Sequence, residues 1–312
     1  MNYNWPKNSN LNILDILEKN IAKDSLANFY IFSGPKALGK FSIAQAFAKN
    51  IFIKGNSELM GRDNILDISP DFFLIEKEDG KKNISIEQVR DLISRLSLSS
   101  FLNSYKVVVI KNGENLNQSS ANALLKLLEE FKTKMVVIMT TDDISAIPKT
   151  IISRSRLFNF SLASFDFIYD TLIEDFKLKP SEAKIIAKIS AGRISLAYSL
   201  INNLNEYIET VKELASFFSI GIHQRVSMVP YLVKEGEYSI IEIWETIVRD
   251  LMLLSVNKGE LVQNSFIIDD LRRIEIDGKK LQQLEFDINK AKDYIKANMN
   301  IKSVLEYIAV NV

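Results

Sequence analysis

Seven residues, Gly34 to Lys40, read Gly-Pro-Lys-Ala-Leu-Gly-Lys and have the spacing of a phosphate-binding loop. In such loops the glycines let backbone N–H groups curl around phosphates, and the final lysine reaches the β and γ oxygens. A short apolar run precedes the loop and a helical run follows it, which is the context that the motif requires. The sequence therefore predicts a loop descended from a nucleotide-binding P-loop, with Gly34, Gly39 and Lys40 as its phosphate-facing residues.

The residues that would hold magnesium in such a site are missing at both expected places. The position after the lysine should be Ser or Thr, but it is Phe41, and Ser42 comes one position late, about 100° further round the helix. The second ligand should be a carboxylate that follows a later apolar strand, where this chain has Lys111 and Asn112. An ammonium ~4 Å from a divalent ion would cost about 8 kcal/mol at an effective dielectric constant near 20. We therefore predict that the chain does not hydrolyse ATP in its own site.

Nucleotide binding is a separate question from hydrolysis. Lys40 and the loop amides could still hold ATP or ADP weakly, or the loop could now serve only as a turn between a strand and a helix. The second interpretation is favoured, so no cofactor is expected to be required. The chain has no cysteine and a single histidine, His223, so neither zinc nor another metal site is expected.

The composition is that of an ordinary globular protein. Lys plus Arg and Asp plus Glu number 39 each, so the formal net charge is zero, unlike the strongly basic balance of many nucleic-acid-binding domains. Local basic faces are compatible with this balance. The N-terminal residues are polar and unlike a signal peptide, and no apolar run approaches the ~18 residues of a membrane span. We expect a cytoplasmic protein with no membrane association.

The first half of the chain alternates strand-like and helix-like runs. Short apolar runs rich in β-branched and aromatic residues predict buried parallel strands at 29–33, 72–75, 106–110, 135–140 and 157–160. Between them, residues 117–131 carry apolar side chains at helical spacing, with Asn117 as the expected N-cap. This alternation predicts an α/β domain with a parallel sheet, in which residues 55–71 form a loop.

After about residue 161 the pattern becomes entirely helical. Residues 165–204 read as three short helices, broken by Lys179-Pro180 and by Ala191-Gly192. Residues 206–312 read as a longer helical domain. The predicted fold is α/β followed by all-α, divided into domains at 1–162, 163–205 and 206–312.

Several segments in a fixed order carry a resemblance to a known family. They are SGPKALGK with the following FSIAQAFA, residues 69–101, residues 105–131, VVIMTT, IPKTIISRSRLFNF, WETIVRDLMLL and ANMNIKSVLEYI. Together they resemble the delta-prime family of bacterial clamp-loader subunits, which are components of the DNA polymerase III holoenzyme. The most specific part is ANALLKLLEE followed by TIISRSR. The resemblance implies an AAA+ RecA-like domain, a small three-helix lid and a C-terminal helical collar domain that holds a ring of subunits together.

The resemblance also implies partners and roles for particular residues. The partners would be gamma/tau-type ATPase and delta-type subunits, the sliding clamp, and primer–template DNA within the complex. Ser153-Arg154-Ser155 matches the family's Ser-Arg-Cys, whose arginine acts as a finger in a neighbour's ATP site. Without the family, Arg154 would be interpreted as a solvated residue at a helix end, and Arg156 is the nearest alternative finger. Thr141 would stand at the family's sensor position.

A further implied role concerns DNA. The predicted amphipathic helix 87–98 carries Arg90 and Arg95 on its polar side, and the corresponding helix of clamp loaders faces the DNA backbone. The alternative is an ordinary solvated helix face.

Some residues depart from the family pattern. Many relatives carry a four-cysteine zinc module after the P-loop helix, but residues 51–70 of this chain contain no cysteine, so the module has lost its metal or is absent. Ser195 stands where a working relative has a γ-phosphate-sensing arginine, with Arg193 two positions early. One alternative interpretation is an active gamma/tau-type ATPase with atypical magnesium ligands, which Phe41, Lys111 and Asn112 oppose. Another is a different AAA+-derived DNA-binding or repair factor, which the ANALLKLLEE and SRSR segments oppose.

Overall fold

The computed structural model describes residues 3–97, 105–130, 134–233, 240–297 and 299–312. The helices predicted at 87–98 and 117–131 have their last residues, 98 and 131, outside the described residues. The chain divides into two compact units, which are Met1–Ile168 with Gly192–Leu196, and Tyr169–Ala191 with Ala197–Val312. Within the described part of the chain, no helix combines the length and apolarity needed to cross a bilayer.

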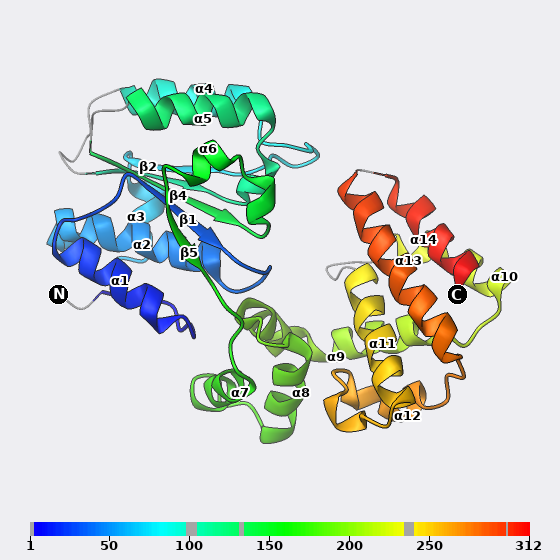
Figure 1. The fold of residues 1–312 in the computed structure, drawn as a ribbon. Coiled ribbons are helices and arrows are strands. Elements are labelled where there is room, and N and C mark those ends of the chain that lie inside the picture. The colour runs from blue at the N-terminus through cyan, green and yellow to red at the C-terminus, as the bar shows by residue number, and fades with distance from the viewer. Residues whose placement is uncertain (1–2, 98–104, 131–133, 234–239, 298) are drawn as a thin grey trace. The chain divides into compact units, whose positions relative to one another are not determined.

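The first unit is built on a five-stranded, entirely parallel sheet with the strand order β2-β3-β4-β1-β5 (Figure 1). The strands are β1 (Phe29–Ser33), β2 (Phe72–Ile75), β3 (Lys106–Ile110), β4 (Met135–Thr141) and β5 (Arg156–Asn159). All five predicted strands are confirmed, with β4 one residue longer and β5 one residue earlier than expected. Strand β1 lies between β4 and β5, and the chain leaves β1 and β4 in opposite directions along the sheet, toward β2 and toward β5 respectively. Parallel α/β sheets bind their ligands at such a point, beyond the carboxyl ends of the strands.

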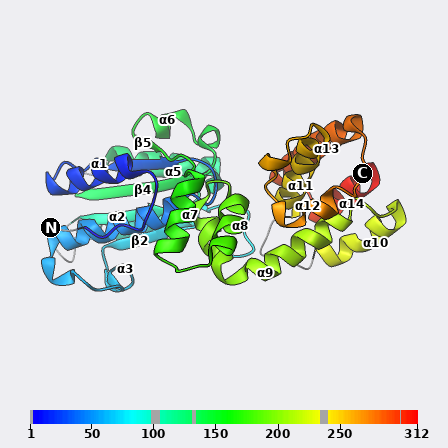
Figure 2. The ribbon, with the colours of Figure 1, turned by 90° about the horizontal axis from the view of Figure 1, so that it is seen from below.

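Alternate residues of each strand face opposite sides of the sheet, and each side has its own helical cover. Tyr30 and Phe32 of β1 pack in the core beneath α1, α2 and α3, whereas Phe29 and Ile31 pack beneath α4, α5 and α6 (Figures 1 and 2). These helices are α1 (Leu11–Ala22), α2 (Lys40–Gly55), α3 (Ile65–Ile68), α4 (Ile86–Ser97), α5 (Gln118–Glu130) and α6 (Lys149–Ile152). Burial on both faces explains why β1, β3 and β4 read as continuous apolar runs. The expectation of buried strands is wrong for β2, which is half-buried, and for β5, where only Phe158 is buried, because both lie at the edges of the sheet.

A local sequence signal fixes the start of α5, whereas a segment expected to be a loop contains a helix. Asn117 caps α5 as predicted, because its Oδ1 accepts a hydrogen bond from the Ser120 backbone N–H at 2.8 Å. The segment 55–71 is not all loop, however, since it contains α3 and a short 3-10 turn. Ile65 and Leu66 of α3 are buried and hold it against the core. A helix of one turn is too short to show a 3.6-residue period.

The chain after β5 is helical throughout its described part. Its helices are α7 (Phe165–Glu174), α8 (Pro180–Ser190), α9 (Ile194–Ser216), α10 (Ile222–Leu232), α11 (Ile240–Ser255), α12 (Ile268–Leu271), α13 (Gly278–Lys296) and α14 (Ile301–Asn311). The predicted breaks near Pro180 and Gly192 are confirmed. No loop separates the third predicted short helix from the next, because α9 passes through Asn203 with only a local non-helical φ of −117°. The domain boundary at 205/206 therefore falls within a helix, and the three-domain division stays a prediction.

A buried carboxylate joins three segments of the second unit. Asp250 on α11 is fully buried and accepts hydrogen bonds at 2.8 Å from the backbone N–H groups of Gln263 and Asn264 and from the Asn264 side chain. Gln263 in turn donates from Nε2 to the carbonyl of Ile189 in α8 at 2.6 Å. Burial raises the pKa of Asp250 above its ordinary 3.8, although these hydrogen bonds act in the opposite direction. Asp250 thus holds the 259–264 segment against α11.

Replacing Asp250 by asparagine is expected to lower the free energy of unfolding by about 1–3 kcal/mol, because an amide N–H would face a buried N–H donor. Asp269→Asn is the control, since Asp269 is exposed and its pair with Arg272 spans 3.4 Å, so its loss should cost less than about 0.5 kcal/mol. Denaturant unfolding of both variants measures the difference. Because the pKa of Asp250 is raised in the folded state, the native state keeps a proton at pH values where the unfolded state has lost it. The difference in free energy of unfolding between the wild type and Asp250→Asn should therefore shrink as pH rises through the folded-state pKa. Equal losses in the two variants would contradict the structural role of Asp250.

Candidate functional site

The predicted P-loop lies at the carboxyl end of β1 and leads directly into α2. Its backbone has positive φ at Gly34 (148°), Ala37 (64°) and Gly39 (80°). Gly34 also packs so tightly that an added Cβ would lie 2.5 Å from the carbonyl oxygen of Phe160. The backbone N–H of Gly34 donates to the carbonyl of Thr141 at 3.3 Å, which ties the loop to the end of β4. The loop therefore sits at the point of the sheet where a ligand site is expected.

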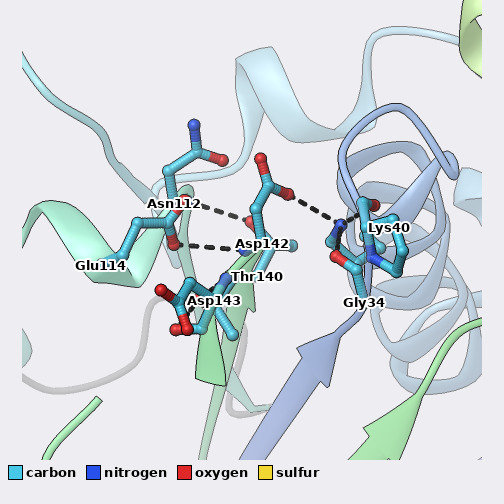
Figure 3. Close-up of polar contacts among 9 residues, drawn as sticks. Gly34, Lys40, Asn112, Glu114, Thr140, Asp142 and Asp143 are labelled. Atoms are coloured by element: carbon cyan, nitrogen blue, oxygen red, sulfur yellow. Dashed lines mark hydrogen bonds and ion pairs between the residues drawn. The ribbon is translucent and has the colours of Figure 1, made fainter. Parts of the chain in front are cut away.

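The ammonium group of the P-loop lysine forms hydrogen bonds with groups of its own chain. Lys40 is 5% exposed, and its Nζ donates to the carbonyls of Gly34 at 2.5 Å and Pro35 at 2.6 Å. Its third partner is the Oδ1 atom of Asp142 at 2.8 Å (Figure 3). Because an ammonium group has three N–H donors, these contacts use all of them.

Sequence reasoning missed Asp142, although a positional signal existed. Asp142 directly follows Thr141, the last residue of β4, and Thr141 pairs in register with Ser33 at the end of β1. Residues that follow neighbouring parallel strands emerge at the same edge of the sheet. The strand order needed to use this signal was not available from local sequence patterns.

The two residues that depart from the magnesium-binding pattern contact each other. The Nζ of Lys111 lies 4.9 Å from the centroid of the Phe41 ring and 2.8 Å from the Oε2 of Glu76. A cation over an aromatic face within ~6 Å is attracted to it. Glu76, which sequence reasoning also missed, follows Ile75, and Ile75 pairs in register with Ile110 just before Lys111. The protein thus places an ammonium group of its own between Phe41 and Glu76.

Asn112 and Glu114 shape the segment after β3. Asn112 has a left-handed φ of 57°, a conformation that asparagine tolerates better than most residues. Its backbone N–H donates to the Thr140 hydroxyl at 3.1 Å, and Glu114 Oε2 accepts from the backbone N–H of Asp142 at 3.4 Å (Figure 3). Glu114 therefore contacts the same strand end as the Lys40–Asp142 pair and adds a second carboxylate there.

Thr141, expected at the sensor position, is fully buried. Its hydroxyl donates to the Asp143 carbonyl at 3.0 Å and accepts from the Asp143 backbone N–H at 3.2 Å. Both bonds stabilise the turn that follows β4 and carries Asp142.

Two further segments of the first unit hold the loop from outside. The Asn8 side chain, 2% exposed, donates from Nδ2 to the Leu38 carbonyl at 2.9 Å. The backbone N–H of Ser195 donates to the Ala37 carbonyl at 2.9 Å. Ser195, in the place of the family's sensing arginine, thus contacts the loop through its main chain, and Asn8 and Ser195 bond two of the loop carbonyls.

Arg154 lies at the amino-terminal end of the parallel strands, whereas the P-loop lies at their carboxyl end. It comes just before β5, whereas Lys40 comes after the carboxyl end of β1, and β1 and β5 run parallel. Strands of four to five residues separate these ends by about 15 Å. The guanidinium group is 43% exposed, contacts Glu129 Oε1 at 2.7 Å from Nη2, and donates to the Thr150 carbonyl at 3.0 Å. Its position therefore suits a phosphate outside its own P-loop.

The other predicted arginines differ from Arg154 in their contacts. Arg156 donates to Asn20 Oδ1 at 3.2 Å and lies 5.6 Å from the Phe158 ring centroid. Arg90 and Arg95 are both exposed on α4. Arg95 pairs with Asp91, one turn away, at 2.9 Å. Their predicted contact with DNA stays a prediction.

The parallel sheet, the P-loop after strand β1 and the helical C-terminal part define a chain of the AAA+ class. A family model described as DNA polymerase III, delta subunit, matches residues 9–164, which is half of the chain. The chain therefore belongs to this clamp-loader family of DNA polymerase III subunits.

Two curated relatives are named as DNA polymerase III subunits, and one solved structure is similar in fold. DNA polymerase III subunit delta′ of Bacillus subtilis is 23% identical, with 96% of this chain and 94% of the relative covered. DNA polymerase III subunit gamma/tau of Mycoplasma genitalium is 29% identical over 64% of this chain, which spans only 35% of that relative. A solved gamma subunit-related protein from Thermotoga maritima has 18% identity and a TM-score of 0.49, with 95% of this chain and 98% of that chain covered.

Proposed function

We propose that the chain is a non-hydrolysing, delta-prime-type subunit of the DNA polymerase III clamp loader, which helps to load the sliding clamp onto primed DNA. The observation that carries this proposal is the contact of Lys111 with Phe41 and Glu76, which puts a protein cation where a hydrolytic site of this class needs a divalent metal. The similarity to the Bacillus subtilis delta′ subunit over nearly the whole chain supports it. In this role the chain requires neither bound nucleotide nor metal.

Arg154 gives the same subunit a part in catalysis by a neighbour. In this proposal it is an arginine finger for an adjacent gamma/tau-type ATPase subunit, where it stabilises charge on the transferring phosphoryl group. Its guanidinium group is exposed and lies at the end of the strands opposite its own P-loop, and both properties support action in trans. A delta-type subunit, the sliding clamp and primer–template DNA complete the proposed complex.

The remaining parts of the chain have mainly architectural roles in this proposal. Residues 1–162 form the degenerate AAA+ domain, 163–205 the lid, and 206–312 the collar through which the subunits assemble. Arg90 and Arg95 face the DNA backbone, where phosphate contacts hold a duplex without reading its sequence.

A second candidate is an active gamma/tau-type ATPase, which the 29% identity to the Mycoplasma genitalium subunit favours. The two candidates differ in one measurable property of the isolated chain. The non-hydrolysing subunit is expected to release no phosphate from magnesium ATP above the level of Lys40→Ala, because the metal ligands are absent. Phosphate release that Lys40→Ala abolishes would replace the first proposal by the second.

A further inference from the structure

We propose that Asp142 is a built-in anion that occupies the phosphate-binding place of the P-loop and excludes polyphosphates from it. The inference goes beyond the proposed function, because an inability to hydrolyse ATP does not by itself decide whether the loop can bind phosphate. It also names a residue outside the P-loop motif as the determinant of that property.

The contacts of Lys40 show what a phosphate would have to displace. Two of its three partners, the carbonyls of Gly34 and Pro35, are neutral, and the third is the Asp142 carboxylate at 2.8 Å. A phosphate oxygen bound to Nζ would therefore lie within ~4–5 Å of this carboxylate, where like charges repel and disfavour binding. In Figure 3 the Asp142 side chain points toward Nζ of Lys40 from the end of β4.

The backbone that carries Asp142 is anchored by two hydrogen bonds. Glu114 accepts a hydrogen bond from the backbone N–H of Asp142 at 3.4 Å, and the Thr141 carbonyl accepts from Gly34 at 3.3 Å. The end of β4 and the start of the P-loop are thus joined by the main chain as well as by the Lys40–Asp142 pair. The Glu114 carboxylate adds further negative charge beside the loop.

The loop is also held by contacts that do not involve Asp142. Asn8 and Ser195 pair with the carbonyls of Leu38 and Ala37. Neutralising Asp142 should therefore leave the loop in place with Lys40 as its cation. Phosphate binding to this loop should also be independent of magnesium, because Phe41 and Lys111 occupy the places of the metal ligands.

The test compares full-length variants in their binding of inorganic tripolyphosphate, measured by titration calorimetry at neutral pH and low salt without magnesium. Asp142→Asn is expected to bind tripolyphosphate at least about tenfold more tightly than the wild type, because the carboxylate charge is gone. Asp143→Asn is the matched control. It removes the same charge one residue away, where the carboxylate contacts Ser145, and should bind like the wild type. Adding Lys40→Ala to Asp142→Asn should abolish the gain.

Three outcomes would overturn the proposal: equal affinity in the wild type and Asp142→Asn, an equal gain in Asp143→Asn, or a gain that survives Lys40→Ala. Asp142→Ser removes the same charge with a smaller side chain and decides the matter if the asparagine variant does not fold. Failure here would leave the non-hydrolysing role intact, because that role rests on Phe41 and Lys111 and is tested by phosphate release.

Discussion

Replacing Arg154 by alanine is expected to lower ATP turnover at one site of a reconstituted clamp loader by about tenfold or more, while the complex still assembles. The guanidinium group lies at the amino-terminal end of the strands, away from its own P-loop, so in the proposed complex it would act on a phosphate of another chain. Loss of an arginine finger can cost ~10³–10⁵ in rate at the site it serves. Tenfold is a lower bound for the one site that Arg154 serves, and total phosphate release falls only by the share of that site where other ATP sites of the complex continue to turn over.

The measurement is steady-state phosphate release by the loader with sliding clamp and primed DNA, with assembly checked by size-exclusion chromatography. Arg154→Ala should fold normally, because its pair with Glu129 is exposed on both sides and such pairs contribute only ~0–1 kcal/mol. Arg156→Ala is the matched control, since Arg156 contacts Asn20 and Phe158 of its own chain, and it should leave turnover unchanged. A loss of turnover in Arg156→Ala instead would identify Arg156 as the arginine finger. Unchanged turnover in both variants would leave a purely architectural subunit.

The elements of the first unit were predictable because each carries its own local pattern. Buried parallel strands are short apolar runs, and the P-loop is recognised by two glycines and a lysine between a strand and a helix. The misses have local causes as well. Helix α3 is too short to show a period, and α9 continues through Asn203 without a glycine or proline to mark its change of direction.

The partners of the site residues were not predictable in the same way. Lys40 and Asp142 are 102 positions apart, and Lys111 and Glu76 are 35 apart. Each pair meets only because two strands are neighbours in the sheet, and neighbourhood is a tertiary property that spacing along the chain does not encode. That Phe41 and Lys111 cannot bind magnesium stays a prediction from the sequence. Their contact with each other, and the carboxylate opposite Lys40, required the strand order.

The survival of a P-loop motif in a chain without magnesium ligands has a structural explanation. Gly34 adopts a φ of 148°. A Cβ atom added at Gly34 would lie 2.5 Å from the carbonyl oxygen of Phe160 and would clash with it. The backbone N–H of Phe160 donates to the carbonyl of Ser33 at 2.7 Å, so the colliding backbone is fixed beside β1. Selection on packing alone would therefore keep glycine at this position, whether or not a phosphate ever binds.

Gly34→Ala is accordingly expected to lower the free energy of unfolding by about 3 kcal/mol or more, from backbone strain together with the clash. Gly80→Ala is the matched control, because Gly80 also has a positive φ, 73°, but an added Cβ meets nothing within 4 Å. Its cost should be about 1 kcal/mol, the left-handed strain less the entropy that alanine removes from the unfolded chain. Denaturant unfolding of the isolated chain measures both. Similar small losses in the two variants would mean that Gly34 is not required by packing, and the motif would then have to be explained by a bound phosphate.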